Sequence, residues 1–183
     1  MKELFFVIWF FLPAGIANVT PIFATRMPFL NHWNYPLDFY KCFNGKRILG
    51  DHKTIRGFIS GIIIGTVSSY LLFKLSFYLP STIYHLPSWY YSSNSILLGI
   101  LLSAGALLGD AVKSFFKRRA NVKPGSTWIP FDQIDYIVGG LFFVSFIHVL
   151  SLVEYILILI VWVAIHIVST VSGYFLHLKD QPY

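Results

Sequence analysis

Charged residues are scarce in this chain. Lys, Arg, Asp and Glu make up 12% of its 183 residues, whereas about 25% is usual for a soluble domain. Hydrophobic residues make up 56% of the chain, and its mean hydropathy is +0.65. This composition excludes an ordinary soluble domain and indicates an integral membrane protein.

Cysteine is nearly absent as well, since Cys42 is the single one. One thiol excludes an intrachain disulfide and a cysteine-based metal cluster, and its position in a loop gives no reason to assign it catalysis. No candidate Ser-His-Asp triad is visible either. His148 and His166 lie inside apolar stretches without a second ligand at metal-binding spacing, which indicates packing residues.

The formal net charge is +6, from 14 Lys and Arg against 8 Asp and Glu. Such an excess could serve nucleic-acid binding, but the bases lie in two clusters beside hydrophobic segments and no nucleic-acid-binding signature is present. We therefore expect no nucleic acid as a partner. The basic clusters are expected to face phosphate groups or lipid headgroups.

Five apolar stretches predict five transmembrane helices, because about 20 apolar residues cross a bilayer. The expected fold class is an all-α integral membrane protein, a single membrane domain over residues 1–183. A signal peptide is the competing interpretation of the first stretch, but its basic start is weak, with Lys2 followed by Glu3. The predicted helices cover residues 3–25, 57–79, 95–119, 132–150 and 153–178, with polar loops at 26–56 and 120–131.

Both basic loops follow odd-numbered helices, so they lie on the same side of the membrane. The positive-inside rule assigns that side to the cytoplasm. The sequence thus predicts a multi-pass protein of the cell membrane with two cytoplasmic loops, its N-terminus outside and its C-terminus inside. The uncharged, aromatic loop at 80–94 fits the opposite interface.

The most informative stretch is the polar segment at 109–135, between two hydrophobic ones. At 3.6 residues per turn, Asp110, Lys113, Ser114 and Lys117 fall on one face of a helix. Carboxylates among cations suit a Mg²⁺–phosphate complex, because carboxylate oxygens hold the hard metal and Lys or Arg neutralise the remaining negative charge.

Asp132 and Asp135 form a second acidic pair, one turn apart. A positive-inside flank would account for the bases of this segment but not for the carboxylates among them. A helix N-cap would account for Asp132 but would leave Asp135 without a role. The first loop adds Gly45, Gly50 and Gly57, which allow the backbone to approach a phosphate, although the Walker spacing of a P-loop is absent.

Short polar stretches that together form a family pattern run through the chain in order: Asn18-Val-Thr-Pro21, Leu37-Asp-Phe39, Gly45-Lys-Arg-Ile-Leu-Gly-Asp51, Lys53-Thr54, Arg56-Gly57, Gly109-Asp110, Lys113-Ser114, Lys117-Arg-Arg119, Lys123-Pro-Gly125, Trp128 and Asp132-Gln-Ile-Asp135. In these stretches the chain resembles the CDP-archaeol synthases, membrane cytidylyltransferases related to the CTP:phosphatidate cytidylyltransferases. Tyr40 departs from the resemblance at a position where Gly is expected, and Thr170 at one where Asn is expected.

The resemblance implies transfer of a cytidylyl group from CTP to a lipid phosphate, with Mg²⁺ required and pyrophosphate released. The lipid would be of the 2,3-bis-O-geranylgeranylglycerol 1-phosphate type. We expect Asp110, Asp132 and Asp135 to hold the metal, and these three with Lys113 and Lys117 to form the catalytic set. The residues expected to bind nucleotide or phosphate are Lys46, Arg47, Asp51, Lys53, Arg56, Ser114, Arg118, Arg119 and Lys123.

Several alternatives stay open at this point. The enzyme could be a CDP-diacylglycerol synthase acting on phosphatidate. A CDP-alcohol phosphotransferase is disfavoured because Asp110 has no acidic partner three or four residues on. A small membrane transporter would carry ionisable residues near the bilayer midplane, whereas here they gather at helix ends. A structural lipid-binding protein and a homodimer are both compatible with the sequence.

Overall fold

The computed structural model describes residues 2–80, 86–123 and 126–175. Residues 176–178 of the last predicted helix and residues 124–125 of the second loop lie outside this part. A 3₁₀ helix, η1 (Pro28–Trp33), and a short antiparallel hairpin of β1 (Cys42–Phe43) and β2 (Lys46–Arg47) connect the first two helices. The α-helices are α1 (Lys2–Ala24), α2 (Ile55–Ser76), α3 (Ser88–Ser92), α4 (Ser95–Arg119), α5 (Phe131–Val144) and α6 (Leu152–Phe175).

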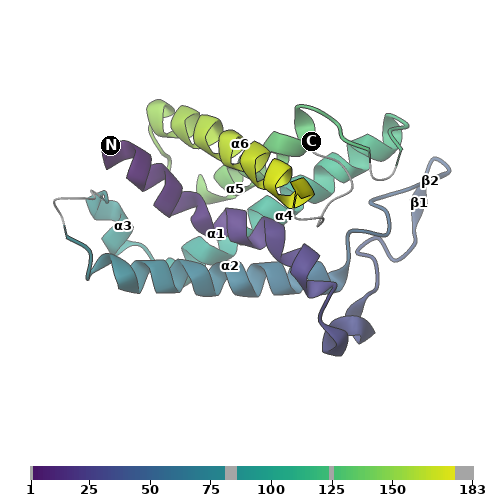
Figure 1. The fold of residues 1–183 in the computed structure, drawn as a ribbon, viewed down its shortest axis with the longest axis horizontal. Helices are drawn as coiled ribbons and strands as arrows, with labels where there is room; N and C mark the ends of the chain where they lie inside the picture. Colours follow the sequence, from purple (N-terminus) through teal and green to yellow (C-terminus); the bar gives the residue numbers. More distant parts are fainter. Residues whose placement is uncertain (1, 81–85, 124–125, 176–183) are drawn as a thin grey trace.

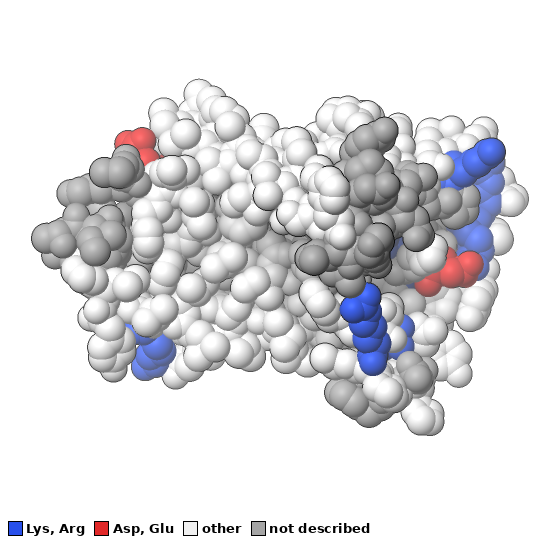
Figure 2. Space-filling model, in the orientation of Figure 1, with Lys and Arg blue, Asp and Glu red and all other residues white. Residues whose placement is uncertain are grey.

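Four of these helices, α1, α2, α4 and α6, are long and apolar enough to cross a membrane. On the face shown in Figure 2, the broad middle carries no charged side chains, and the visible Lys, Arg, Asp and Glu lie toward the two ends. Most of the visible charge lies at the end that carries the β1–β2 hairpin in Figure 1. The protein is therefore a helical integral membrane protein, as its composition predicts.

The predicted helix at 132–150 is shorter in the structure. α5 has 14 residues, which corresponds to about 21 Å of helix, against about 30 Å of bilayer hydrocarbon. The amides of Phe146 and Ile147 bond three residues back, to Phe143 and Val144. His148 stacks on Trp89 of α3, with ring centroids 3.7 Å apart. α5 thus ends at Val144, ahead of this contact.

Local capping explains where α2 and α4 begin. The side chain of Asn94 accepts hydrogen bonds from the amides of Ile96 and Leu97, both at 3.1 Å, and fixes the start of α4. α4 covers the predicted range 95–119. Thr54 caps α2 by accepting from the Gly57 amide at 3.2 Å, so α2 begins two residues before the predicted start.

Glycines bring α4 and α5 into close contact. A Cβ at Gly109 would overlap the carbonyl of Asp135, and one at Gly139 would overlap the carbonyl of Gly105. Only a residue without a side chain permits this approach. The consequence for the site is direct, because Asp110 and Asp135 lie next to these contact points on the two helices.

Aromatic side chains tie α1, α5 and α6 together in the apolar core. The Trp162 indole donates a hydrogen bond to the Val7 carbonyl at 3.0 Å, and the Tyr136 hydroxyl donates to the Trp162 carbonyl at 3.1 Å. Phe11 and Trp162 pack edge to face. α5 is thus held against two longer helices although it is short itself.

Candidate functional site

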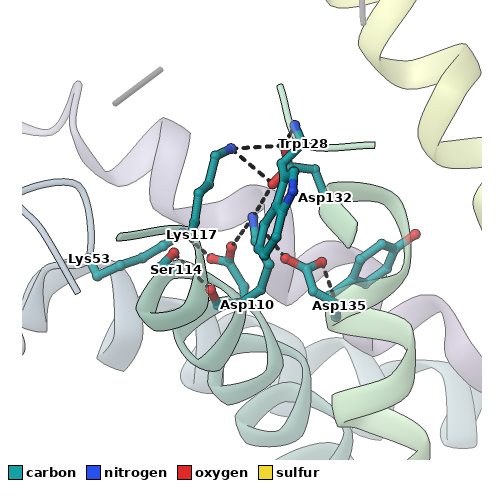
Figure 3. Close-up of polar contacts among 9 residues, drawn as sticks. Lys53, Asp110, Ser114, Lys117, Trp128, Asp132 and Asp135 are labelled. Carbon is teal, nitrogen blue, oxygen red and sulfur yellow. Dashed lines mark hydrogen bonds and ion pairs between the residues drawn. The ribbon is translucent and has the colours of Figure 1, made fainter. Parts of the chain in front are cut away.

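The ammonium group of Lys113 lies among three carboxylates (Figure 3). Its Nζ is 2.6 Å from Asp132 Oδ1, 3.0 Å from Asp135 Oδ2 and 3.2 Å from Asp110 Oδ1. α4 supplies Lys113 and Asp110, while α5 supplies the other two acids. The close packing of these helices therefore assembles the acids that the sequence analysis singled out.

Two further lysines complete this ion-pair cluster. Lys53, in the first loop, pairs with Asp110 Oδ2, and Lys117 Nζ lies 2.9 Å from Asp132 Oδ2. Three carboxylates thus face three ammonium groups, and each side chain is at least three-quarters shielded from solvent. Because the opposite charges are paired, their attraction offsets part of the free-energy cost of removing these ions from water.

The predicted shared face of α4 is confirmed in part by this geometry. Asp110, Lys113 and Lys117 all point into the cluster. Ser114 lies on the same side, but its hydroxyl donates to the Asp110 carbonyl at 2.9 Å, a bond back along its own helix. Its hydroxyl therefore serves the helix in this arrangement.

No group of three His, Cys, Asp or Glu side chains in the described ranges stands ready to hold a metal ion by itself. The Lys113 ammonium takes the central position instead, and Asp132 also accepts from the Trp128 amide at 2.6 Å. The donor set nonetheless fits Mg²⁺, because carboxylate oxygens are the protein ligands that this ion prefers. Three carboxylates converge on the Lys113 ammonium group, so this is the point of the site where a positive charge is stabilised.

A polar cavity of about 370 Å³ adjoins the cluster. It lies between the first loop and the C-terminal part of α4, which is predicted to face the cytoplasm. Half of the ten residues that line it are Lys or Arg. Nε of Arg118 is buried and has no hydrogen-bond partner within the described part of the chain. The lining residues are Arg47, Leu49, Gly50, Asp51, His52, Lys53, Lys113, Ser114, Lys117 and Arg118.

Four residues expected to bind nucleotide or phosphate do not line this cavity. Lys46 Nζ bonds to Asn121 Oδ1 at 2.5 Å. Arg119 donates to the Arg47 carbonyl at 2.8 Å, and its guanidinium lies 4.2 Å from the Phe115 ring centroid. Arg56 is buried at the start of α2, and Lys123 is exposed after α4. Lys46 and Arg119 instead fasten the β1–β2 hairpin to the end of α4.

Asp38 organises the first loop, a role that the sequence analysis did not assign. Its carboxylate accepts from Arg47 Nη2 at 2.7 Å and from the amides of Leu49 and Gly50 at 2.9 and 3.1 Å. Burial by itself raises the pKa of Asp38, but the hydrogen bond from Arg47 and those from the two amides lower it to about 2. Asp38 is therefore ionised at neutral pH and holds the loop at the rim of the polar cavity.

Tyr40 adopts a φ of +63°, in the left-handed region that favours glycine. The sequence resemblance expects Gly at this position, and the backbone explains why Gly would fit. Here the Arg47 guanidinium lies 5.0 Å from the Tyr40 ring centroid, so a cation–π contact offsets part of the backbone strain. Arg47 is in this way held by Asp38, by Asp51 at 2.6 Å and by Tyr40.

A second, larger cavity of about 570 Å³ lies between α4 and α5. Apart from Lys113 and Asp135 at its polar end, its wall is apolar or aromatic. Several lining side chains, such as Phe116, Val138 and Phe142, are more than half exposed on the outside of the bundle, so the cavity opens toward the bilayer. The lining residues are Leu108, Gly109, Val112, Lys113, Phe116, Trp128, Phe131, Asp135, Val138, Gly139, Phe142 and Phe143.

Residues 1–183 match the family model of the CarS-like CDP-archaeol synthases. A relative from Thermococcus kodakarensis, named CDP-archaeol synthase, is 34% identical over 185 residues, covering 100% of this chain and 98% of the relative. A protein of the same name from Pyrococcus furiosus is 33% identical over 176 residues, covering 96% and 95%.

A solved structure, described as an intramembrane enzyme for archaeal membrane lipid biosynthesis, has a similar fold. It matches with a TM-score of 0.71 at 26% sequence identity, over 88% of this chain and 90% of that chain. The likeness therefore extends along nearly the whole length of both proteins.

Proposed function

The chain belongs to the CDP-archaeol synthase family and is a membrane enzyme. We propose that it transfers the cytidylyl group of CTP to the phosphate of a membrane lipid. The observation that carries this proposal is that Lys113 lines both cavities. The polar cavity and the apolar cavity therefore share the Lys113 ammonium group. A phosphate bound to this group would be accessible from both cavities.

The polar cavity suits the triphosphate of CTP. Lys53, Lys117 and Arg118 present cations to it, and the buried Nε of Arg118 has a donor to offer. A triphosphate brings more negative charge than one lysine can neutralise, so several converging cations are needed. Asp51 lies at the rim with its side chain 76% exposed, bonded to Arg47, which favours a role in holding the first loop over a role as metal ligand.

The apolar cavity suits the lipid. An opening between α4 and α5 would let an isoprenoid or acyl chain enter from the bilayer while its phosphate stays at Lys113. Apolar side chains release ordered water when they contact such a chain, which favours binding. The lipid phosphate and the nucleotide would then meet beside the carboxylates.

Mg²⁺ would be held by oxygens of Asp110, Asp132 and Asp135, and when bound it would supply positive charge to the triphosphate and the leaving pyrophosphate. These carboxylates now pair with Lys53, Lys113 and Lys117. We propose that the lysines turn from the carboxylates to phosphate oxygens when substrate binds. The same six side chains would then neutralise a cation and a polyanion together.

The chemistry proposed for these residues is an in-line displacement at the α-phosphorus of CTP. An oxygen of the lipid phosphate forms a new bond to that phosphorus, and the bond to the oxygen that bridges to the β-phosphate breaks. Pyrophosphate leaves, with Lys117 and Arg118 placed to neutralise its charge. A lipid phosphate is already ionised near neutral pH, so no dedicated general base is required.

We further propose the membrane orientation predicted from the loops. α5 together with the residues up to Leu150 would form a fourth crossing and α6 a fifth, with the site on the cytoplasmic face. Figure 1 supports this, because α1 and α6 both begin at the end of the bundle opposite the hairpin. The N-terminus would then be outside and the C-terminus inside.

Incorporation of label from CTP into lipid by the purified protein tests the proposed function. A geranylgeranyl ether glycerol phosphate and a diacyl phosphatidate are offered in parallel with Mg²⁺, and ATP and GTP serve as nucleotide controls. We expect label from CTP in the ether lipid. Labelling of phosphatidate alone would make the enzyme a CDP-diacylglycerol synthase, and no labelling of either lipid by folded protein would contradict the proposal.

A further inference from the structure

Trp128 lines the apolar cavity together with Lys113 and Asp135, both members of the ion-pair cluster. In Figure 3 its indole extends from the segment before α5 into the region of the cluster. A lipid bound in the apolar cavity with its phosphate at Lys113 would therefore lie in the cavity whose wall the indole helps to form.

Two backbone hydrogen bonds fix Trp128 relative to the charged groups. Its amide donates to Asp132 Oδ2 at 2.6 Å, and its carbonyl accepts from the Asp132 amide at 3.0 Å. Asp132 in turn pairs with Lys113 and Lys117. The position of the indole is thus tied to the same carboxylate that positions the ammonium groups.

The ring itself is supported by a neighbouring aromatic side chain. The Phe131 ring lies with its centroid 4.4 Å from that of Trp128, and both rings line the cavity. Paired rings lose little conformational entropy when a ligand packs on them, because they are already ordered. An indole at this level also offers an apolar face and one N–H donor, which matches the junction of a lipid chain with its polar end.

We propose that Trp128 positions the lipid substrate, with its indole against the glycerol backbone so that the phosphate lies at Lys113. This inference rests on the proposed function, since it takes the lipid phosphate as the acceptor. Trp128 takes no part in bond making. It sets the depth to which a glycerol phosphate enters the site, and reaction rates depend steeply on such placement.

The test compares Trp128→Ala and Trp128→Phe with the wild type, and Trp33→Phe serves as a matched control. Trp33 is exposed on η1 and lines neither cavity. We expect Trp128→Ala to raise KM for a geranylgeranyl ether glycerol phosphate about tenfold, with Trp128→Phe intermediate. The affinity for Mg²⁺ with CTP, measured by calorimetry without lipid, should stay near that of the wild type in both variants.

Intrinsic fluorescence supplies a readout that does not depend on turnover. Titration with the same lipid phosphate should change the emission of the wild type and of Trp33→Phe, and this change should be largely lost in Trp128→Phe. The corresponding lipid alcohol, which lacks the phosphate, should produce a smaller change. Persistence of the full change in Trp128→Phe would overturn the inference, as would an equal loss of CTP affinity in Trp128→Ala.

The proposed cytidylyl transfer and the proposed role of Trp128 can be contradicted independently of each other. A wild type that transfers no label but keeps a lipid-dependent emission change at Trp128 would count against the cytidylyl transfer and in favour of the lipid site. A wild type that transfers label while Trp128→Ala keeps its KM for the lipid would do the opposite.

Discussion

Lys113 is central to the site, because its one ammonium group contacts the carboxylates of Asp110, Asp132 and Asp135. Removal of an acid from this set therefore has two effects. It removes a metal ligand under the proposed function, and it leaves Lys113 with fewer partners in a partly buried place.

Asp135→Asn should lower turnover about 100-fold or more, because a neutral amide replaces a carboxylate that is proposed to hold Mg²⁺. The Asp135 side chain is 5% exposed. Because an Asn side chain has nearly the same shape as an Asp side chain, the variant should still insert and fold. Turnover is measured at saturating CTP over a range of Mg²⁺ concentrations. Glu154→Gln, at the start of α6, is the matched acid-to-amide control and should leave turnover near the wild-type value. Near-native turnover of Asp135→Asn at low Mg²⁺ would remove Asp135 from the metal set.

Residue types and spacing on α4 were enough to predict which residues of this helix point into the cluster, since 3.6 residues per turn places Asp110, Lys113 and Lys117 together. The role of Asp38 could not be predicted in this way. Its partners are an arginine and two amides supplied by residues nine to twelve positions on, and only the folded hairpin brings them to it. The same holds for Arg119, whose charge suggested phosphate binding but which packs on Phe115.

At the scale of the element, the contact between α4 and α5 sets the spacing of the acids. The helix range 95–119 was predictable from a long apolar stretch that continues into the polar segment, and in the structure the Asn94 cap fixes its start. The end of α5 was not, because Phe146 and Ile147 are as apolar as the residues before them. Beyond the end of the helix, the amides of Phe146 and Ile147 bond three residues back and His148 stacks on Trp89, a contact between distant parts of the chain.

Gly109→Ala should lower both the thermal midpoint and the turnover. A methyl group at this position meets the Asp135 carbonyl, so α4 and α5 must separate, at a cost of about 1–3 kcal/mol. Thermal unfolding in detergent and the labelling assay measure the two effects. Ile100→Ala, on an exposed side of α4, is the control and should change turnover little. A variant with native stability and native turnover would contradict the packing described for these helices.

At the scale of the molecule, the proposed function together with the balanced charge of the ion-pair cluster predicts that CTP and Mg²⁺ bind together. Mg²⁺ alone would have to displace the lysine ammonium groups from the carboxylates, with no other anion for these groups to pair with. CTP alone would have to draw the lysines away and leave the carboxylates unpaired. Because each ligand supplies a partner for the groups that the other displaces, their binding free energies are coupled.

Calorimetry on the full protein in nanodiscs measures this coupling. We expect the affinity for CTP to rise about tenfold or more when Mg²⁺ is present, beyond the change due to complex formation in solution. Lys113→Ala should reduce the coupling, because it leaves the carboxylates without their central partner and so ready for the cation. Equal CTP affinities with and without Mg²⁺ would argue against the exchange of partners proposed for the six side chains.

The two cavities open to different surroundings, one toward water and one between α4 and α5 toward the bilayer. On the proposed reaction, the products would part as they form, pyrophosphate into the aqueous phase and the nucleotide-bearing lipid into the membrane. The reverse reaction would need both to return to one site from two phases. The architecture thus favours the forward direction in practice without altering the equilibrium constant of the reaction.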